Sequence, residues 1–263
     1  MSQMTLFPLT NLPLVAPDDN IANLIVDSLE TMQQQLQEGD IVVIAQKIVS
    51  KAEGRVIPLP ENPDERARKV AVATDKEPRF VAAVLQDSTS IVHGRRGMLV
   101  VRQKSGWTCS NAGIDRSNVG VQNPEECQLA LLPEDADASA RKIRDDLLEL
   151  TGVAAAVLIN DSFGRPWRLG TVGVCIGCAG LAPIWDQRGR SDLFGYQFDT
   201  SEECIADELS AAATLVMGQG AEGNPVVIVR GYELPNQPPQ PATTIQRGQS
   251  SAPSLVNVEI EDI

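Results

Sequence analysis

Two acidic loop segments hold the side chains of this sequence that are best suited to chemistry. Asp161 and Ser162 follow an apolar run, and Asp115 lies in a second loop that is rich in small polar residues. Carboxylate and hydroxyl oxygens are the ligands that Mg²⁺ or Mn²⁺ prefers, so acids from two distant loops can share one divalent cation. Both acids can equally be turn formers, because Asp side chains bond to nearby backbone. The pattern alone leaves both interpretations open.

Two lysines form the second candidate group. Lys47 and Lys51 are four residues apart and directly follow the apolar run 41–45. On a helical turn both ammonium groups would lie on one face, and two cations at the end of a strand suit a polyphosphate. A solvated basic edge is the simpler interpretation of the spacing. Arg165 and Arg168 are also close enough to Asp161 in sequence to meet an anion that accompanies a metal.

The cysteines and the histidine of this sequence give only weak indications of a metal, redox or catalytic site. The odd number of cysteines, five, does not predict a disulfide framework, and one CxxC, Cys175 and Cys178, is a weak zinc or redox signal. Because small apolar residues flank this motif, we expect buried thiols in a strand. His93 is the single histidine, expected in a surface turn. Catalysis would therefore depend on Asp, Glu, Lys, Arg or a metal.

The composition limits the class of protein. The chain has 263 residues with 43% hydrophobic content, enough for a substantial core. A net charge of −13 argues against general nucleic-acid binding, which needs a basic face. No apolar run approaches the roughly 20 residues of a membrane span, and the N-terminus lacks signal-peptide features. We therefore expect a reduced, cytoplasmic chain without nucleic-acid or membrane partners.

Apolar periodicity predicts the elements that must position these side chains. Strands are expected at 41–45, 91–93, 98–102, 153–159, 172–177 and 225–230. Helices are expected at 21–29 with Asp18 or Asp19 as N-cap, at 64–73, at 78–86, up to Thr151 with Gly152 as C-cap, and at 199–217. Together they predict a mixed α/β (α+β) fold. From residue 233 the composition becomes proline-rich and predicts a flexible tail, with a short docking strand at 254–260.

Four motifs in order carry a family resemblance. They are GDIVVIAQKIVSKAEGRV, NAGIDRSNV, NDSFGRPWRLGTVGVCIG and ADELSAAATLVMGQGAEGNPVVIVRG. Together they resemble the coenzyme F420-0:L-glutamate ligases, or γ-glutamyl ligases, over roughly residues 10–232. The resemblance implies a family-specific γ-glutamyl ligase fold that forms an intertwined homodimer. It places a ligase domain at 1–232 and leaves the tail, 233–263, outside.

The resemblance also implies an activity. Family members join L-glutamate to the deazaflavin coenzyme F420-0, then add a second glutamate through its γ-carboxyl group. GTP becomes GDP and phosphate, an acyl phosphate is the expected intermediate, and Mg²⁺ or Mn²⁺ and K⁺ are the expected ions. Two alternatives stay open: the same GTP and metal chemistry on a different acceptor, and a non-catalytic nucleotide-binding protein.

The family resemblance also implies site residues, at the positions of this sequence that match the family's motifs. The resemblance implies that GTP is bound by Leu12, Pro13, Leu14, Val15, Gln46, Lys47, Lys51, Asn118, Gly218, Gly220, Glu222 and Gly223. Lys47 and Lys51 would be catalytic. The implied metal ligands are Asp115, Asp161, Ser162 and Gln219.

Overall fold

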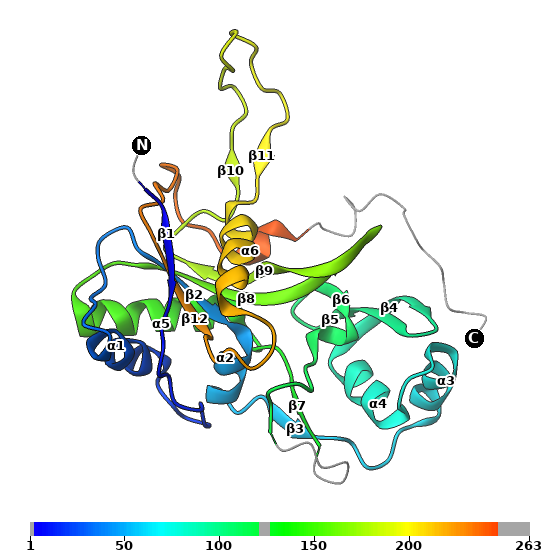
Figure 1. The fold of residues 1–263 in the computed structure, drawn as a ribbon. Coiled ribbons are helices and arrows are strands. Elements are labelled where there is room, and N and C mark those ends of the chain that lie inside the picture. The colour runs from blue at the N-terminus through cyan, green and yellow to red at the C-terminus, as the bar shows by residue number, and fades with distance from the viewer. Residues whose placement is uncertain (1–2, 121–126, 247–263) are drawn as a thin grey trace.

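A five-stranded sheet forms the centre of the molecule (Figure 1). The computed structural model describes residues 3–120 and 127–246. In order across the sheet, the strands are β1 (Thr5–Pro8), β12 (Val226–Arg230), β2 (Ile41–Ala45), β8 (Ala156–Arg165) and β9 (Arg168–Ala179). β2 and β8 run parallel, whereas the other neighbouring pairs are antiparallel. This is the mixed α/β fold that the sequence predicts.

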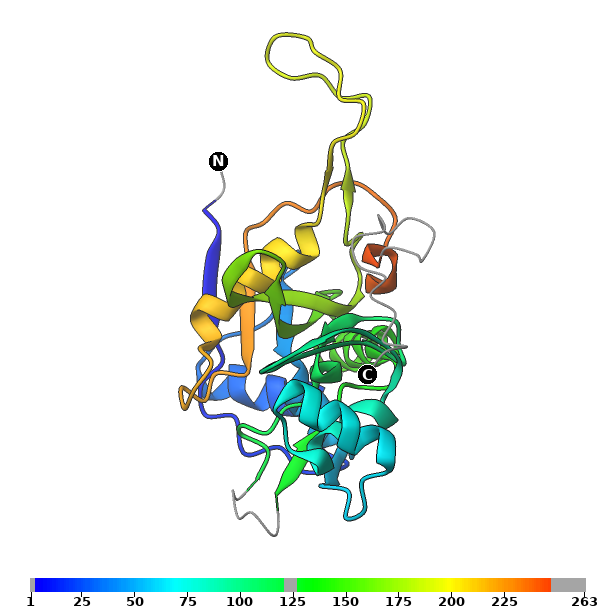
Figure 2. The same ribbon diagram turned by 90° about the vertical axis from the view of Figure 1, so that its right-hand side faces the viewer.

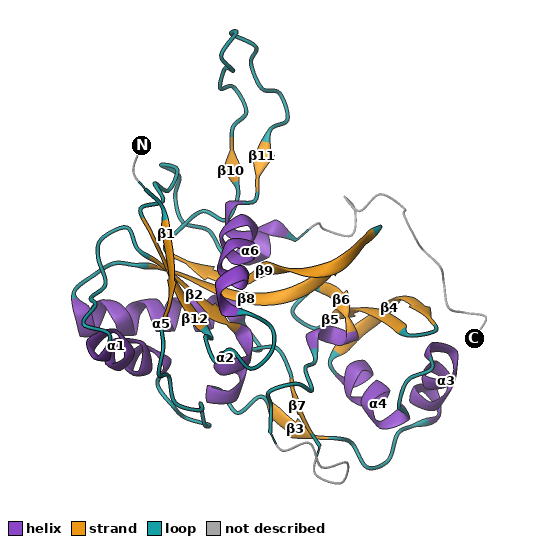
Figure 3. Cartoon of the chain, viewed as in Figure 1, coloured by secondary structure: helices purple, strands orange, loops and turns teal. Residues whose placement is uncertain are grey.

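The central strands are apolar on both faces because helices cover both faces (Figure 3). Val42 and Ile44 of β2 pack with helices on one side, and Ile41 and Val43 pack on the other. The helices on the first side are α1 (Ile21–Thr31), α2 (Gln46–Ala52) and α5 (Ala136–Thr151), and α6 (Ile205–Met217) covers the second. The uninterrupted β-branched run of β2 follows from this double burial.

A smaller lobe has its own hydrophobic core and lies beside the main body (Figure 1). It consists of α3 (Glu65–Thr74), α4 (Pro78–Gln86), β4 (Ser88–Arg95), β5 (Met98–Gln103), β6 (Thr108–Ser110) and the 3₁₀ turn η1 (Asn111–Gly113). An antiparallel ribbon connects the lobe to the body, made of β3 (Val56–Pro58) and β7 (Gln128–Ala130).

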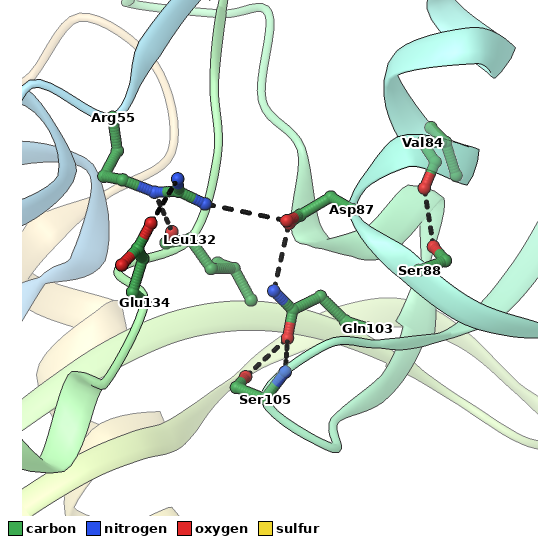
Figure 4. A network of polar contacts seen from close by, with 8 residues as sticks. All are labelled: Arg55, Val84, Asp87, Ser88, Gln103, Ser105, Leu132 and Glu134. Carbon is green, nitrogen blue, oxygen red and sulfur yellow. Dashed lines mark hydrogen bonds and ion pairs between the residues drawn. The ribbon is translucent and has the colours of Figure 1, made fainter.

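A polar network joins the lobe to the body (Figure 4). Arg55, just after α2, lies 3.6 Å from the Asp87 carboxylate at the end of α4. Asp87 also accepts a hydrogen bond of 3.0 Å from Gln103 Nε2, and Gln103 Oε1 accepts from the backbone N–H and hydroxyl of Ser105. Arg55 Nε donates to the carbonyl of Leu132 in the body. Asp87 and Gln103 are buried, so the network holds the two cores in one relative position.

A long hairpin arm stands away from the body in both ribbon views (Figures 1 and 2). Its base is a short antiparallel pair, β10 (Trp185–Asp186) with β11 (Glu202–Glu203). Near its tip Leu193 and Phe194 are 98% and 96% exposed. Large apolar side chains held in water are typical of a surface that contacts another molecule.

Two predicted element starts are wrong. The N-cap of α1 is Asn20, whose side chain accepts from the backbone N–H of Asn23, whereas the Asp19 carboxylate accepts from Ala16 in the preceding turn. The helix expected at 199–217 begins at Ile205, because residues 202–203 pair with β10 in the arm. Hairpin pairing overrides the local preference for a helix in this stretch.

Two strands extend beyond their predicted ends. β8 continues to Arg165 because β9 pairs with it along a long hairpin. The strand expected at 91–93 extends over Ser88–Arg95 as β4. His93, which was also expected at a surface turn, lies within this strand and pairs with Val100. The C-cap of α5 is Gly152, with the left-handed backbone (φ 73°) that the sequence predicts.

Part of the proline-rich segment packs on the body. Ala242, in the 3₁₀ turn η2 (Ala242–Ile245), is fully buried against the α6 face of the sheet. The buried Asp137 carboxylate accepts from the backbone N–H groups of Ala242 and Cys178 at 2.6 and 2.9 Å. The part of this segment around Ala242 therefore packs on the body beside β9, while the flexibility expected for the tail 233–263 stays a prediction. The predicted strand at 254–260 lies outside the described residues, and the domain limit at 232 stays a prediction.

None of the described helices is long and apolar enough to cross a membrane.

Removing the Asp87 carboxylate would leave Arg55 and Gln103 without their shared partner. We expect Asp87→Ala to lower the free energy of unfolding by about 3 kcal/mol in urea denaturation. The matched control is Glu65→Ala, which removes an exposed carboxylate paired with Lys69 on α3 and should cost less than about 0.5 kcal/mol. Equal effects of the two substitutions would show that the network does not hold the lobe.

Candidate functional site at one edge of the central sheet

Four passages of the chain meet at one edge of the central sheet. β2 ends there at Ala45, which pairs with Asn160 of the parallel strand β8. β12 is antiparallel to β2 and begins at the same edge, since Val226 pairs with Ile44. β1 is antiparallel to β12 and ends at this edge. Strand direction therefore brings the segments after β1 and β2, the loop before β12 and the middle of β8 together.

These segments enclose a cavity of about 800 Å³. Its walls include every residue that the family resemblance implies for nucleotide or metal binding, and we group them by segment. The first segment supplies Leu12, Pro13, Leu14 and Val15; α2 supplies Gln46, Lys47 and Lys51; the lobe connection supplies Asp115 and Asn118; β8 supplies Asp161 and Ser162; the loop before β12 supplies Gly218, Gln219, Gly220, Glu222 and Gly223. Their roles stay predictions, but their proximity is a property of the fold.

Asp115 is fixed at both its backbone and its side chain. Its backbone exchanges two hydrogen bonds with Ala130 of β7, of 2.9 and 3.0 Å. Its Oδ2 atom accepts from Gln46 Nε2 at 2.9 Å and lies 3.2 Å from Lys47 Nζ. Neither of these side-chain contacts involves the second carboxylate oxygen, Oδ1.

The carboxyl group of Asp161 has a strongly raised pKa. Burial, and then the nearby charge of Asp115, raise the pKa of its carboxyl to about 7, against the opposing effects of the Ser162 backbone N–H and Lys47. The Ser162 N–H donates to Asp161 Oδ1 at 2.8 Å, and Gln219 Nε2 donates to Ser162 Oγ at 2.6 Å. Two carboxylates this close repel each other unless a proton or a cation lies between them.

The oxygen atoms at this edge fit a hard divalent cation. The two carboxylates, the Ser162 hydroxyl and the Gln219 amide supply the donor types that Mg²⁺ and Mn²⁺ prefer. Within residues 3–120 and 127–246, no cluster of three or more His, Cys, Asp or Glu side chains could hold a metal. A cation here would therefore need the hydroxyl and amide oxygens, or water, in addition to the two acids.

Both predicted lysines lie on α2 and line the cavity, so the expectation that they share one helix face is confirmed. Lys47 also lies 3.4 Å from Ser117 Oγ. Burial, and then the charge of Lys47, lower the pKa of Lys51. Two crowded ammonium groups in a partly enclosed cavity attract an anion, because an anion relieves their mutual repulsion.

The loop before β12 closes one side of the cavity. Asn118 Nδ2 donates to the carbonyl of Gly220 at 2.8 Å and so ties this loop to the lobe connection. Gly218 has a positive φ of 73°, and a Cβ there would lie 2.3 Å from the Glu222 carboxyl carbon. Glu222 itself accepts from the Gly220 N–H. The positive φ angles of Gly218 and Gly223 favour glycine at these two positions of the turn.

Further residues line the cavity without having been predicted, namely Ser117, Asn160, Thr171, Thr214 and Asn224. Asn160 Nδ2 donates to Thr214 Oγ1 at 3.0 Å, which joins β8 to α6. Only Asn160 had a sequence signal, its position at the end of the apolar run. Arg165 and Arg168, suggested as anion ligands, lie farther along the β8–β9 hairpin and do not line the cavity.

Cys175 and Cys178 are free thiols buried in β9, as predicted. Burial raises the pKa of the Cys175 thiol well above its usual value. A reactive thiolate is therefore disfavoured at this motif.

Comparison with known proteins gives a consistent result. The model of the family described as F420-0:Gamma-glutamyl ligase matches residues 10–231. A protein named coenzyme F420:L-glutamate ligase from Methanothermobacter thermautotrophicus is 47% identical over 87% of this chain and 89% of its own length. Proteins with the same name from Archaeoglobus fulgidus and Methanocaldococcus jannaschii are each 41% identical, over 99% and 77% of this chain and 96% and 80% of their own lengths.

The raised pKa of Asp161 has a consequence for stability without metal. A carboxyl whose pKa is about 7 when folded and about 4 when unfolded binds more protons in the folded state between these values. Stability is therefore lost as the pH rises through this window. We expect metal-free Asp161→Asn to exceed the wild type in unfolding free energy by on the order of 2 kcal/mol at pH 8. At about pH 3, below both pKa values, the two should agree, measured by urea denaturation with EDTA; an equal difference at both pH values would contradict this.

Proposed function

The chain belongs to the F420-0:gamma-glutamyl ligase family, and from this premise we propose that it joins L-glutamate to coenzyme F420-0 with conversion of GTP to GDP and phosphate. The observation that carries the proposal is the single cavity that combines two lysines with two carboxylates. Such a cavity suits a nucleoside triphosphate, because phosphoryl transfer depends on positioning and on charge stabilisation.

The proposed reaction has two steps. First, a carboxylate oxygen of F420-0 attacks the γ-phosphorus of GTP, the bond to the β-phosphate oxygen breaks, and an acyl phosphate and GDP result. Second, the glutamate amine attacks the acyl carbon, loses a proton, and expels inorganic phosphate to leave an amide. A second glutamate would be added in the same way, through the γ-carboxyl group of the first.

The chain's own residues have distinct tasks in this scheme. Lys47 and Lys51 stabilise the negative charge on the phosphoryl group in transit. Asp115, Asp161, Ser162 and Gln219 would hold Mg²⁺ or Mn²⁺, which neutralises phosphate charge when bound. The glycine loop at 218–223 and the segment at 12–15 form walls that enclose the nucleotide. K⁺ remains an expected ion without assigned ligands.

Two other functions differ from this proposal, one in its acid substrate and one in lacking catalysis. A ligase for another acceptor would keep the same nucleotide and metal residues and differ only in its acid substrate. A non-catalytic nucleotide-binding protein would not need two carboxylates suited to a metal beside two lysines, so the cavity favours an enzyme.

The activity can be tested by GDP release with Mn²⁺, L-glutamate and F420-0, with the product masses measured in parallel. We expect a GTP-dependent mass gain of one or two glutamyl units. Asp115→Asn and Asp161→Asn should lower the rate by roughly 100-fold or more while the protein stays folded. Asp145→Asn is the control, because this exposed carboxylate lies on α5 outside the cavity.

The outcomes of this assay separate the alternatives. Full activity in the two aspartate variants would refute the metal assignment. GTP binding without a glutamyl product would instead point to another acceptor.

We further propose that the protein is a homodimer, with the hairpin arm as part of the interface. Leu193 and Phe194 are almost fully exposed on an arm that touches nothing else in the described chain near its tip, and Tyr196 is 62% exposed (Figures 1 and 2). Burial of these side chains against a second copy would remove apolar surface from water.

Phe194→Asp is expected to convert dimers into monomers, because it would place a charge in an apolar contact. Light scattering after size-exclusion chromatography measures the mass. Val72→Asp makes the same change at another exposed apolar residue, on α3, and should leave the dimer intact. A Phe194→Asp protein that remains dimeric would exclude the arm from the interface.

A further inference from the structure

Ser50 in α2 departs from the usual behaviour of a hydroxyl in a helix. Thr74, Thr151 and Thr214 each donate to the backbone carbonyl four residues earlier, which is the common local partner. Ser50 Oγ instead lies 2.9 Å from the side-chain Oε1 of Gln46. Ser50 is completely buried and does not line the cavity, so its hydroxyl holds a side chain in place.

The orientation of the Gln46 amide follows from its two partners. The Asp115 carboxylate, which is paired with Lys47, can only accept hydrogen bonds, so Gln46 must present its Nε2 group to it. Oε1 then faces Ser50, and the Ser50 hydroxyl must be the donor. A rotated amide would place its oxygen against the carboxylate. Since Gln46 is 2% exposed, water has little access to replace either bond.

This arrangement selects the oxygen of Asp115 that can bind a cation. Gln46 and Lys47 both contact Oδ2, which leaves Oδ1 without either bond. A carboxylate held in this way presents one defined oxygen to the cavity that also contains Asp161. Hydrogen bonds to a metal-binding carboxylate commonly fix its orientation and change metal affinity.

We propose that Ser50 is a positioning residue for the divalent cation and acts by holding the Gln46 amide in the orientation that anchors Asp115. The inference rests on the proposed function, because it assumes that Asp115 binds the cation. Ser50 itself touches neither the cation nor a substrate.

Mn²⁺ affinity of the metal-free, full-length protein tests this role, measured by calorimetry and by electron paramagnetic resonance without substrates. Ser50→Ala is expected to weaken Mn²⁺ binding about tenfold. Gln46→Met removes both side-chain bonds at similar size, and in that background Ser50→Ala should have no further effect. Ser50→Cys retains a weaker donor of similar volume and should give an intermediate loss.

The control is Ser88→Ala, which removes a hydroxyl that donates to the backbone carbonyl of Val84 in the lobe (Figure 4). It should leave the Mn²⁺ affinity unchanged. Unchanged affinity in Ser50→Ala, or in Ser50→Cys if the alanine variant does not fold, would overturn the inference. An equal loss from Ser50→Ala with and without Gln46→Met would also overturn it. Absence of Mn²⁺ binding in the wild type would reject the cation site itself, and the positioning role with it.

Discussion

The parallel pairing of β2 with β8 is the constraint on which the rest of the site depends. In a parallel pair both strands end at the same edge, so α2 begins beside the point where β8 carries Asn160 and Asp161. β1 and β12 then complete the edge through antiparallel pairing, and each adds a segment to the cavity wall. A change in the β2–β8 register by one residue would turn Asp161 to the other face of the sheet.

Among the residues that the structure describes, only one lysine and one carboxylate at this edge of the sheet form an ion pair with each other. Lys47 is paired with Asp115, whereas Asp161 lies in a more enclosed position and its pKa is raised to about 7. Lys51 pairs with no carboxylate among residues 3–120 and 127–246, and its pKa is lowered by burial and by Lys47. The cavity thus contains two pairs of like charges that repel each other: Asp161 with Asp115, and Lys51 with Lys47. A cation bound with a polyphosphate would relieve both conditions at once, which is the physical basis of the proposed ligase chemistry.

The two acids belong to different parts of the molecule. Asp161 lies on the central sheet, whereas Asp115 follows the 3₁₀ turn of the lobe and bridges to β7. Their separation is therefore set by how the lobe sits on the body. The Arg55–Asp87–Gln103 network joins the lobe to the body (Figure 4). Gln46 of α2 donates a hydrogen bond to Asp115. β6 also lies near this junction: burial, Asp161 and Asp87 together raise the pKa of Cys109 to about 12.

Local sequence determined the central strands, most helices and the chemical types of the site residues. The uninterrupted apolar run of β2 and the Gly152 cap of α5 are local signals that the fold obeys. The start of α6 and the full length of β8 were not predictable, because each depends on which residues pair across a hairpin. Sequence likewise left open whether Lys47 and Lys51 form a solvated edge. Only the tertiary structure decided that they line one cavity together with Asp115 and Asp161, since strand direction and lobe position bring those residues together.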